Sequence, residues 1–376
     1  MKNNKFRKIA IIGAGASGIV AAIKLKEKNP SFMVVLIDKN NKIGKKIYAT
    51  GNGKCNIGNV RVNENSYNVN SINSFINEKK VKSYIEELKT LGIYVKEKDG
   101  LLYPINECAA SVVDVLSEKI NKLGVKCKLN TTVINYEPSN YGYILKYGDN
   151  TTEEFDEVII STGGAASSLY GNSLAIFEML KKHGYHITPL FPGLCPVKTT
   201  LINKELNGVR EKALITLFSE GKSVYSEEGE VLFKEDGLSG ISIFNISSII
   251  ARNPNKKYEI TLNFLYNIDD KKIMDYTTVI NPNLLRFIYL KYGKNVDLNK
   301  ILKSFTVEYQ KNYDFVNSQV CVGGVDIADI NISSYSSKIE DHVYLIGEVL
   351  NVDGLCGGYN LMFAIISALE LVLFFR

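Results

Sequence analysis

The stretch Lys8-Ile-Ala-Ile-Ile-Gly-Ala-Gly-Ala-Ser-Gly18 carries the strongest local pattern in this sequence. Its apolar half, residues 9–12, predicts a short buried strand that runs directly into three glycines. A helix-forming run follows at residues 19–28, and a second apolar strand, residues 33–37, ends on Asp38 about 20 residues after the last glycine. Strand, glycine turn, helix, second strand and acid thus have the order and spacing of a dinucleotide-binding unit.

Each glycine of this stretch has a different physical task. Gly13 makes the tight turn, while Gly15 has no Cβ, so a pyrophosphate can approach the backbone. Gly18 allows the helix to pack closely on the strand. The N–H groups and the positive end of the helix would hold the phosphates, and Asp38 would accept hydrogen bonds from a ribose. A glycine-rich turn in a loop is the alternative, but the strands, helix and acid in register favour the nucleotide site.

Length and composition indicate a soluble globular protein of two or three domains. The chain has 376 residues, of which 45% are hydrophobic and 23% charged. Its formal net charge is +5. Because the lysines are scattered along the chain, we expect a solvated surface and no nucleic-acid partner.

The cysteines and the two chain ends point to a reducing compartment. The six cysteines form no CxxC pair and have no metal-ligand spacing with the three histidines, which argues against a zinc site and a redox dithiol. The first strand begins within ten residues of the N-terminus, so we expect no signal peptide. The apolar run 361–374 contains Glu370 and is shorter than a membrane span, so we expect a buried helix, no membrane contact and a cytoplasmic location.

Two further glycine-rich segments are candidates for the same ligand. Residues 44–59 combine four glycines and three asparagines with Lys45, Lys46 and Lys54, a composition that can wrap a polyanion. A mobile surface loop is the alternative, but the position just behind Asp38 favours ligand contact. The run Glu157-Val-Ile-Ile-Ser-Thr-Gly-Gly164 predicts another parallel strand whose carboxyl end passes close to the nucleotide.

The remaining pattern divides the chain into a nucleotide domain and an insertion. Helical spacing appears at 77–91 and 109–123, and strands are predicted at 125–129, 132–136, 141–147 and 155–161. A proline-rich crossover at 189–196 is the best boundary candidate. We predict a discontinuous nucleotide domain (1–190 and 322–376), an inserted β-barrel (191–266, closed by about 313–321) and a helical annex (267–312).

Several motifs taken together resemble one family. They are the glycine fingerprint at 13–18, the ATGNGKCN loop at 49–56, TGG at 162–164, Gly-Glu-Val-Leu at 347–350 and DGxxGGYNL at 353–361. The pattern is similar to the bacterial FAD-binding flavoproteins that include aminoacetone oxidase and the bile-acid pathway 3-dehydro-bile acid reductase. The resemblance covers nearly the whole chain. It implies an α/β fold, with a Rossmann-like FAD domain of the two-dinucleotide-binding type and an inserted β-barrel plus a small helical subdomain.

The resemblance also implies which residues contact FAD. Gly13, Gly15, Ala16, Ser17 and Gly18 would hold the pyrophosphate and Asp38 the adenosine ribose, with Lys39, Lys45 and Lys46 bordering the nucleotide. Thr132 and Val133 would meet the adenine, Gly51, Asn52, Gly53, Cys55 and Asn56 would line the flavin side, and Thr162, Gly163, Gly164, Gly347 and Glu348 would lie along the cofactor, Glu348 by the ribityl chain. Gly358, Tyr359, Asn360 and Leu361, at a helix start, would face the pyrimidine end of the flavin, where a positive helix end favours the negative charge of the reduced ring.

Departures from the family pattern concentrate in the insertion. Lys234-Glu235-Asp236 stands where the family often has Thr-His, Ile241 replaces a proline, and Met362 stands where glutamine is commoner. The helical annex is also shortened. Cofactor binding therefore transfers from the family better than substrate identity does.

The expected activity is an FAD-dependent oxidoreductase that transfers a hydride between a small organic substrate and the flavin. The sequence has no second GxGxxG, so a dedicated nicotinamide domain is absent. Two enzymatic choices stay open: an oxidase of a small amine or amino ketone that passes electrons to oxygen, and a reductase that takes electrons from NAD(P)H and reduces an unsaturated ketone. A non-catalytic or RNA-modifying flavoprotein is a third choice, and it would need a basic surface studded with aromatic residues.

No residue is assigned as a catalytic acid or base from the sequence. His183, His186 and His342 are expected to be structural, Cys356 to be a small packing residue, and Tyr359 to stack on or shield the flavin ring without donating a proton. The sequence contains no signal for an oligomeric state.

Overall fold

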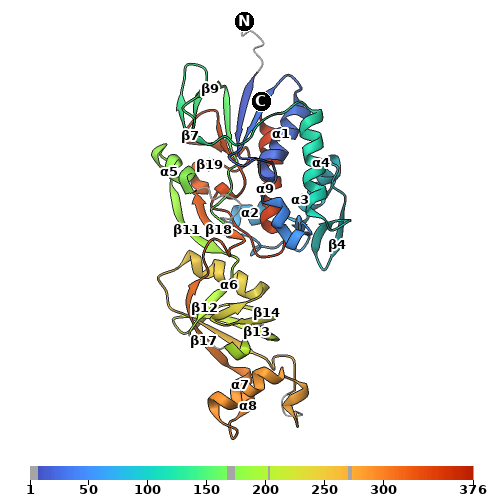
Figure 1. Ribbon diagram of the computed structural model, residues 1–376, viewed down its shortest axis with the longest axis vertical. Coiled ribbons are helices and arrows are strands. Elements are labelled where there is room, and N and C mark those ends of the chain that lie inside the picture. Colours follow the sequence, from blue (N-terminus) through green and yellow to red (C-terminus); the bar gives the residue numbers. More distant parts are fainter. Residues whose placement is uncertain (1–6, 167–173, 202–203, 270–272, 376) are drawn as a thin grey trace. The chain divides into compact units, whose positions relative to one another are not determined.

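The computed structural model describes residues 7–166, 174–201, 204–269 and 273–375 (Figure 1). The chain divides into two compact units: unit 1 holds Met1–Leu190 and Gly323–Arg376, and unit 2 holds Phe191–Val322. Two strands, β11 (Ile187–Gly193) and β18 (Val320–Val325), carry the chain across these two boundaries and pair with each other.

A seven-stranded sheet forms the centre of unit 1. Its strands lie in the order β19 (Ile330–Asn331), β20 (Ser336–Ser337), β21 (Val343–Leu345), β10 (Glu157–Ile160), β1 (Lys8–Ile12), β2 (Met33–Ile37) and β6 (Lys126–Lys128). The strands from β21 to β6 are parallel, and Ile11 of β1 pairs with Ile159 on one side and Leu36 on the other. Because both faces of the central strands are covered, residues 9–12 of β1, 34–37 of β2 and 158–160 of β10 are continuous buried apolar runs, whereas the edge strand β6 (Lys-Cys-Lys) is largely exposed.

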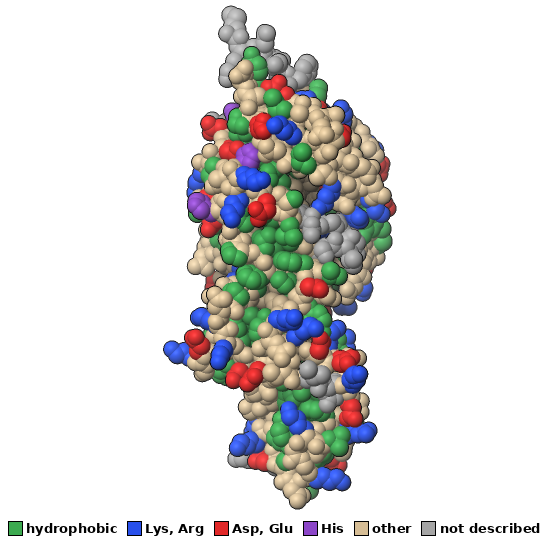
Figure 2. Space-filling view, turned by 60° about the vertical axis from the view of Figure 1, so that its left-hand side comes forward, with side chains coloured by type: hydrophobic (Ala, Val, Ile, Leu, Met, Phe, Trp, Pro, Cys, Tyr) green, Lys and Arg blue, Asp and Glu red, His purple; other side chains and the backbone are tan. Residues whose placement is uncertain are grey.

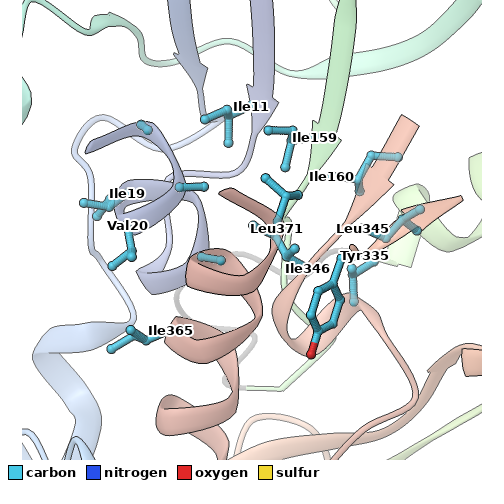
Figure 3. Packing of buried hydrophobic residues seen from close by; sticks show 14 of the residues in the cluster. Ile11, Ile19, Val20, Ile159, Ile160, Tyr335, Leu345, Ile346, Ile365 and Leu371 are labelled. Carbon is cyan, nitrogen blue, oxygen red and sulfur yellow. The ribbon is translucent and has the colours of Figure 1, made fainter. Parts of the chain in front are cut away.

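Two helices pack together against this sheet. α1 (Ala16–Lys28) follows the first strand, and α9 (Tyr359–Phe374) comes from the other end of the chain. Ile19 and Val20 of α1, Leu371 of α9 and Ile11 of the sheet belong to one buried hydrophobic cluster, part of which is shown in Figure 3. The C-terminal apolar run is thus a buried helix, as predicted, and in the described part of the chain no helix is both long and apolar enough to span a membrane.

Smaller elements complete unit 1. Two three-stranded antiparallel sheets are built from β7 (Val133–Pro138), β8 (Tyr143–Tyr147) and β9 (Thr152–Phe155), and from β3 (Gly58–Asn59), β5 (Leu101–Pro104) and β4 (Val95–Lys98). The helices are α2 (Asn70–Phe75), α3 (Glu78–Thr90), α4 (Ala109–Lys122) and α5 (Leu174–Lys182), with 3₁₀ turns η1 (Ile47–Gly53), η6 (Ile327–Asp329) and η7 (Gly347–Val349). The helices predicted at 77–91 and 109–123 are confirmed as α3 and α4.

Unit 2 contains a closed antiparallel barrel. Its six strands are β12 (Val197–Thr199), β15 (Gly237–Ser239), β14 (Lys222–Lys234), β13 (Arg210–Ser219), β16 (Tyr258–Asn263) and β17 (Phe305–Asn312). Around it lie η3 (Lys204–Leu206), α6 (Ile241–Arg252), η5 (Tyr276–Thr278), α7 (Pro282–Tyr292) and α8 (Leu298–Lys303). The fold class predicted from the sequence, a Rossmann-type domain with an inserted barrel, is confirmed.

The strand that closes the barrel differs from the prediction. β17 pairs with β12 and β16, so the barrel is closed by Phe305–Asn312 and not by 313–321, and the helical part ends at Lys303 and not at 312. The sequence pattern explains why β17 was predicted as part of the helical segment. Phe305 lies three residues after Leu302, which mimics a helix, whereas the buried positions Phe305 and Val307 begin the two-residue period of a strand.

Charges of both signs are interspersed on the surface. Figure 2 shows basic and acidic side chains next to one another over the face in view. The ion pairs of unit 1 agree with this picture, because exposed lysines such as Lys89, Lys122 and Lys146 each contact a glutamate within 2.7 Å.

Candidate functional site: a nucleotide cradle

The glycine turn predicted at residues 13–18 connects β1 to α1. A Cβ atom at Gly13 would lie 2.4 Å from the Ser161 carbonyl oxygen, and one at Gly18 would lie 2.0 Å from the Gly13 carbonyl oxygen. Neither position has room for a side chain, and Gly13 also has a φ of +108°. A Cβ at Gly15 would instead meet no atom within 4 Å. Gly15 therefore borders open space in front of the helix, as the approach of a pyrophosphate requires.

The start of α1 faces this space with its backbone. The N-cap residue of α1 is Gly15. Because glycine has no side chain, no capping side chain occupies the first N–H groups of the helix. Ser17 is buried and lies against Gly347, where a Cβ would come within 2.6 Å of the Ser17 Oγ. Ala16 and Ser17 would therefore contact phosphates through their N–H groups and not through their side chains.

Asp38 is held in place by the turn itself. Its Oδ2 accepts a hydrogen bond from the Ala14 N–H at 2.7 Å, and its Oδ1 accepts from the Asn40 N–H at 2.7 Å. These contacts fix the carboxylate at the carboxyl end of β2, beside the glycine turn, where a bound ribose would lie.

The residues expected to border the adenosine lie around Asp38. The Asp38 carbonyl accepts the Thr131 N–H at 2.9 Å, so Thr132 and Val133, at the start of β7, follow directly. The Lys45 Nζ lies 3.3 Å from the Asn40 side-chain oxygen. Burial lowers the pKa of Lys39, and the Asp38 carboxylate partly opposes that shift.

A second set of residues joins the two ends of the chain. Glu348 accepts a hydrogen bond from the Gly164 N–H at 3.0 Å, and the Lys46 Nζ lies 3.9 Å from the same carboxylate oxygen. Lys46 also donates to the Gly164 carbonyl at 3.1 Å. A Cβ at Gly163 would lie 3.5 Å from the Glu348 carboxylate. Thr162 lies against Gly13, because a Cβ at Gly13 would come within 2.8 Å of the Thr162 Cα. The segments 46, 162–164 and 347–348 therefore meet beside the glycine turn.

The loop at residues 51–56 has a backbone that few sequences can adopt. Gly51, Asn52, Gly53 and Cys55 all have positive φ, between 53° and 84°. A Cβ at Gly51 would lie 2.7 Å from the Asn56 N, whereas one at Gly53 would meet nothing within 4 Å. Cys55 is fully buried, and burial raises the pKa of its thiol to about 11, so this cysteine is a packing residue.

The start of α9 meets this loop. Gly358 has a φ of +94°, and a Cβ there would lie 2.5 Å from both the Asn56 side-chain amide and the Gly58 carbonyl oxygen. The predicted cofactor residues of the loop and of the C-terminal helix are thus brought together, although they lie about 300 positions apart in the sequence.

The side chains at this helix start point to protein partners. The Tyr359 hydroxyl donates to the Arg61 carbonyl at 2.6 Å, and its ring packs edge-on against Tyr67 at 5.9 Å. The Asn360 amide accepts from the Gly354 N–H and donates to the Gly354 carbonyl. Tyr359 and Asn360 therefore brace the 353–355 loop, and the helix start, with Leu361 half-buried behind it, would act on a flavin through its backbone.

Two serines contribute to this arrangement and were not predicted. The Ser161 Oγ donates to the Gly13 carbonyl at 2.8 Å, and the Ser367 Oγ accepts the Gly347 N–H at 3.0 Å. The positive φ of Gly13 and Gly347 turns their peptide groups toward these hydroxyls. A single serine at a strand end or inside a helix gives no sequence signal for such a contact.

Each of the three histidines contacts a carboxylate. His183 contacts Glu340 at 2.9 Å, His186 contacts Asp329 at 3.0 Å and His342 contacts Glu157 at 3.2 Å. Hydrogen bonding to Asp329 raises the pKa of His186. His183 also stacks on Tyr136 with ring centroids 4.0 Å apart. Each histidine thus has a carboxylate partner, and no group of metal-ligating side chains occurs among the described residues.

We call the converging residues the cradle: the turn 13–18, Asp38, Lys46, the loop 51–56, and residues 162–164, 347–348 and 358. Its residues fit FAD, because Gly15 leaves open the space that a Cβ would fill, a helix start faces that space, and a fixed carboxylate lies beside it.

Comparison with known proteins agrees with this geometry. The model of the HI0933-like protein Rossmann domain matches residues 7–371. The chain belongs to the HI0933-like family. It is 30% identical, over 95% of its length and 96% of the relative's, to the 3-dehydro-bile acid delta(4,6)-reductase of Clostridium scindens. It is 27% identical, over 95% and 96% of the two chains, to the ribosomal RNA dihydrouridine synthase of Haemophilus influenzae.

Among solved structures, the chain is similar to the 3-ketosteroid-delta4-(5alpha)-dehydrogenase of Rhodococcus jostii RHA1. The TM-score is 0.51, with 11% identity and coverage of 99% of this chain and 98% of the other. At this identity the likeness shows the fold alone. Family membership and the cradle support an FAD-dependent oxidoreductase.

Proposed function

We propose that this HI0933-like protein is an FAD-dependent reductase that adds hydrogen across a carbon–carbon double bond conjugated to a carbonyl group, with NAD(P)H as the electron donor. The observation that carries the proposal is the match over 95% of the chain to a relative named as a delta(4,6)-reductase. The name dihydrouridine synthase, carried by a second relative of equal coverage, also describes the saturation of a ring double bond. An aminoacetone-type oxidase has no such support.

The chain's own residues bind and orient the cofactor in this proposal. Bound FAD supplies two-electron redox chemistry between NAD(P)H and the double bond. The N–H groups at the start of α1 hold the pyrophosphate in the space in front of Gly15, and Asp38 accepts hydrogen bonds from the ribose. Glu348, tied to Gly164 and close to Lys46, borders the ribityl chain.

The start of α9 tunes the electron affinity of the site. Its backbone N–H groups carry the positive end of a helix dipole that extends over Tyr359–Phe374. This positive end favours the negative charge of the reduced ring without a group that titrates. The six free cysteines support a reducing compartment, and we propose a cytoplasmic location.

The test compares an enone with oxygen as electron acceptor. The purified protein with FAD is reduced anaerobically with NADH or NADPH and then mixed with 4-androstene-3,17-dione or with air. We expect fast flavin reoxidation by the enone with a product two hydrogens heavier, and slow reoxidation by air. Free FAD at equal concentration is the control. Fast peroxide formation, with no enone turnover and with reduction by aminoacetone, would contradict the proposal and favour an oxidase.

A further inference from the structure

The small antiparallel sheet of β3, β5 and β4 in unit 1 adjoins the cradle. Asn59 of β3 donates a hydrogen bond to the Gly357 carbonyl at 2.9 Å, and a Cβ at Gly357 would lie 3.3 Å from the Leu101 Cδ2. Gly357 comes just before the start of α9, and the loop 51–56 ends two residues before β3. One face of this sheet therefore begins at the residues that would surround the flavin.

Basic side chains line the same face of this sheet. In the antiparallel pair of β4 and β5, Lys96 lies opposite Tyr103 and Lys98 lies opposite Leu101. Because directly opposite residues place their side chains on one face, both lysines share the face on which Leu101 lies against Gly357. Lys98 is exposed, and the Lys96 side chain is 42% exposed, so both ammonium groups are open to solvent.

A third lysine joins this face from the loop 51–56. One Glu107 carboxylate oxygen lies 2.9 Å from the Lys54 Nζ, and the other lies 2.9 Å from the Lys96 Nζ. The hydrogen bonds from Lys96 and Lys54 lower the pKa of Glu107 to about 2. The hydrogen bond to Glu107 raises the pKa of Lys54, and Tyr103 adds to that shift. The two ammonium groups are thus held on either side of one carboxylate.

An arginine extends the basic face at the end that carries Leu101. A Cβ at Gly100, in the turn between β4 and β5, would lie 2.7 Å from the Nε of Arg61, whose side chain is exposed. We call the four cations and the two half-buried side chains of this face the basic strip: Lys54, Arg61, Lys96, Lys98, Leu101 and Tyr103.

The basic strip has positive charge available for an anion. Glu107 is bound within it, whereas Glu97 lies on the opposite face of β4 because side chains alternate along a strand. Asp99 lies in the turn after β4. Each ammonium group has three donors, so Lys54 and Lys96 keep N–H groups for a second anion besides Glu107. A phosphate fits this arrangement, because its oxygens accept from several cations at once.

We propose that the basic strip binds the phosphates of NADPH and so presents the nicotinamide to the flavin. The inference rests on the proposed reductase activity and goes beyond it by naming the donor and its site. The sequence has no second GxGxxG for a separate nicotinamide domain, so the donor site is sought beside the cradle. The strip begins at the start of α9 and at the loop 51–56, and its cations suit the 2′-phosphate that distinguishes NADPH from NADH.

The first test measures the affinity of the FAD-bound full chain for NADPH and NADH by anaerobic rapid mixing, from the dependence of the flavin reduction rate on nucleotide concentration. Wild type should bind NADPH more tightly than NADH. The double variant Lys96→Gln, Lys98→Gln should bind NADPH about tenfold more weakly, the loss of two exposed charge contacts, and NADH only about threefold more weakly. The limiting reduction rate should not change, because the strip holds phosphates and not the reacting ring.

Variants of glutamate and of distant lysines provide the controls. Glu107→Gln removes the carboxylate that occupies two ammonium groups of the strip, so NADPH should bind about threefold more tightly. Glu97→Gln changes the net charge equally on the other face of β4 and should leave the affinity unchanged. Lys122→Gln, Lys146→Gln removes two exposed lysines that each contact a glutamate elsewhere in unit 1, and it should also have no effect. An unchanged flavin spectrum and thermal unfolding curve show that each variant is folded.

A second measurement separates the site from the reaction. Adenosine 2′,5′-bisphosphate carries the 2′-phosphate but no nicotinamide, so its calorimetric titration reports binding without electron transfer. The FAD-bound wild type should bind it more tightly than adenosine 5′-monophosphate, and the Lys96→Gln, Lys98→Gln variant should lose this preference. Equal binding of the two nucleotides to wild type, or a variant that binds both as wild type does, overturns the strip as the NADPH site.

Failure of the strip and failure of the proposed reductase give different results. Flavin reduction by NADPH with the same affinity in wild type, in Lys96→Gln, Lys98→Gln and in Glu107→Gln would overturn the strip and leave the reductase in place. Binding of adenosine 2′,5′-bisphosphate that depends on Lys96 and Lys98, without flavin reduction by NADPH or NADH, would support the phosphate site and overturn the reductase.

Discussion

The cradle of unit 1 and the barrel of unit 2 depend on different properties of their residues. In the cradle, single positions are constrained by backbone geometry: Gly13 and Gly358 combine positive φ with no room for a Cβ, and Gly18 has no room for one. In the barrel, Phe305 and Val307 need only to be apolar and to alternate with exposed positions. The comparison teaches that the cradle depends on which residue stands at single positions, whereas these core positions of the barrel depend on alternation. Gly237 of β15 is an exception within the barrel, because a Cβ there would lie 1.9 Å from the Val197 carbonyl oxygen. Four predictions test this difference, from the largest expected effect to the smallest.

Two glycines of one turn should respond in opposite ways. Gly18→Val places side-chain atoms where the Gly13 carbonyl already lies, so we expect loss of the folded protein, seen as insolubility or the absence of a thermal transition. Gly15→Val projects into open space, so the protein should fold with a normal circular dichroism spectrum but purify without flavin. A folded Gly18→Val protein would contradict the role of Gly18 in folding, and a yellow Gly15→Val protein would contradict the role of Gly15 in flavin binding.

A core substitution in the barrel should destabilise unit 2 without affecting the cradle. Phe305 is 3% exposed and its ring contacts Phe233, Phe264 and Phe287, so Phe305→Ala should cost about 3–5 kcal/mol of unfolding free energy. The neighbouring Thr306 lies on the outside of the barrel, and its hydroxyl is hydrogen-bonded to the Thr261 hydroxyl. Thr306→Val should lower the unfolding free energy by only about 0.5 kcal/mol. Calorimetry should show a lower transition temperature for Phe305→Ala while the flavin remains bound. Loss of flavin in parallel would contradict the independence of the barrel core and the cradle.

Asp38→Ala should weaken the binding of FAD more than the binding of FMN. The variant removes the carboxylate that would bind the adenosine ribose, and the loss of a charged hydrogen-bond acceptor costs about 1.5–3 kcal/mol, or roughly tenfold or more in affinity. FMN lacks the adenosine, so its binding should change little. Titrations of the flavin-free protein with FAD and FMN measure both constants, and equal losses would count against the ribose contact.

Through the ionisation of Glu153, the pH dependence of the unfolding free energy should report on unit 1 alone. Burial raises the pKa of Glu153, but hydrogen bonds from Lys128, Lys8 and Tyr147 outweigh it and lower the pKa to about 2. A lowered pKa gives stability that is complete above the unfolded value of about 4.5 and is lost as the pH falls toward 2.

Glu153→Gln should therefore cost about 1 kcal/mol at pH 7, and the difference from wild type should shrink as the pH falls below 4.5. Urea unfolding at several pH values measures it. A difference that is constant from pH 7 to pH 3 would assign the effect to packing and not to charge.

The sequence predicted those features that depend on local rules. Gly13 forms the tight turn and Gly18 the close helix–strand contact predicted for them, because a positive φ or a close backbone approach restricts the residue type directly. The pyrophosphate contact at Gly15 stays a prediction. α3 and α4 are each within one residue of the predicted bounds, because their apolar period is strong.

Features that depend on distant partners could not be predicted. α6 was not predicted, and β17 was predicted as part of the helical segment, because strand pairing across the barrel leaves no local pattern in the sequence. The hydrogen bond from the Tyr359 hydroxyl to the Arg61 carbonyl, 298 positions away, was likewise not predicted.

The visible absorption spectrum of the purified protein, with and without added FAD, tests the central claim most directly. We predict that the wild-type protein shows a bound-flavin spectrum, or acquires it on addition of FAD, and that Gly15→Val does neither while remaining folded. A well-folded wild-type protein that is colourless and takes up no FAD would contradict the account.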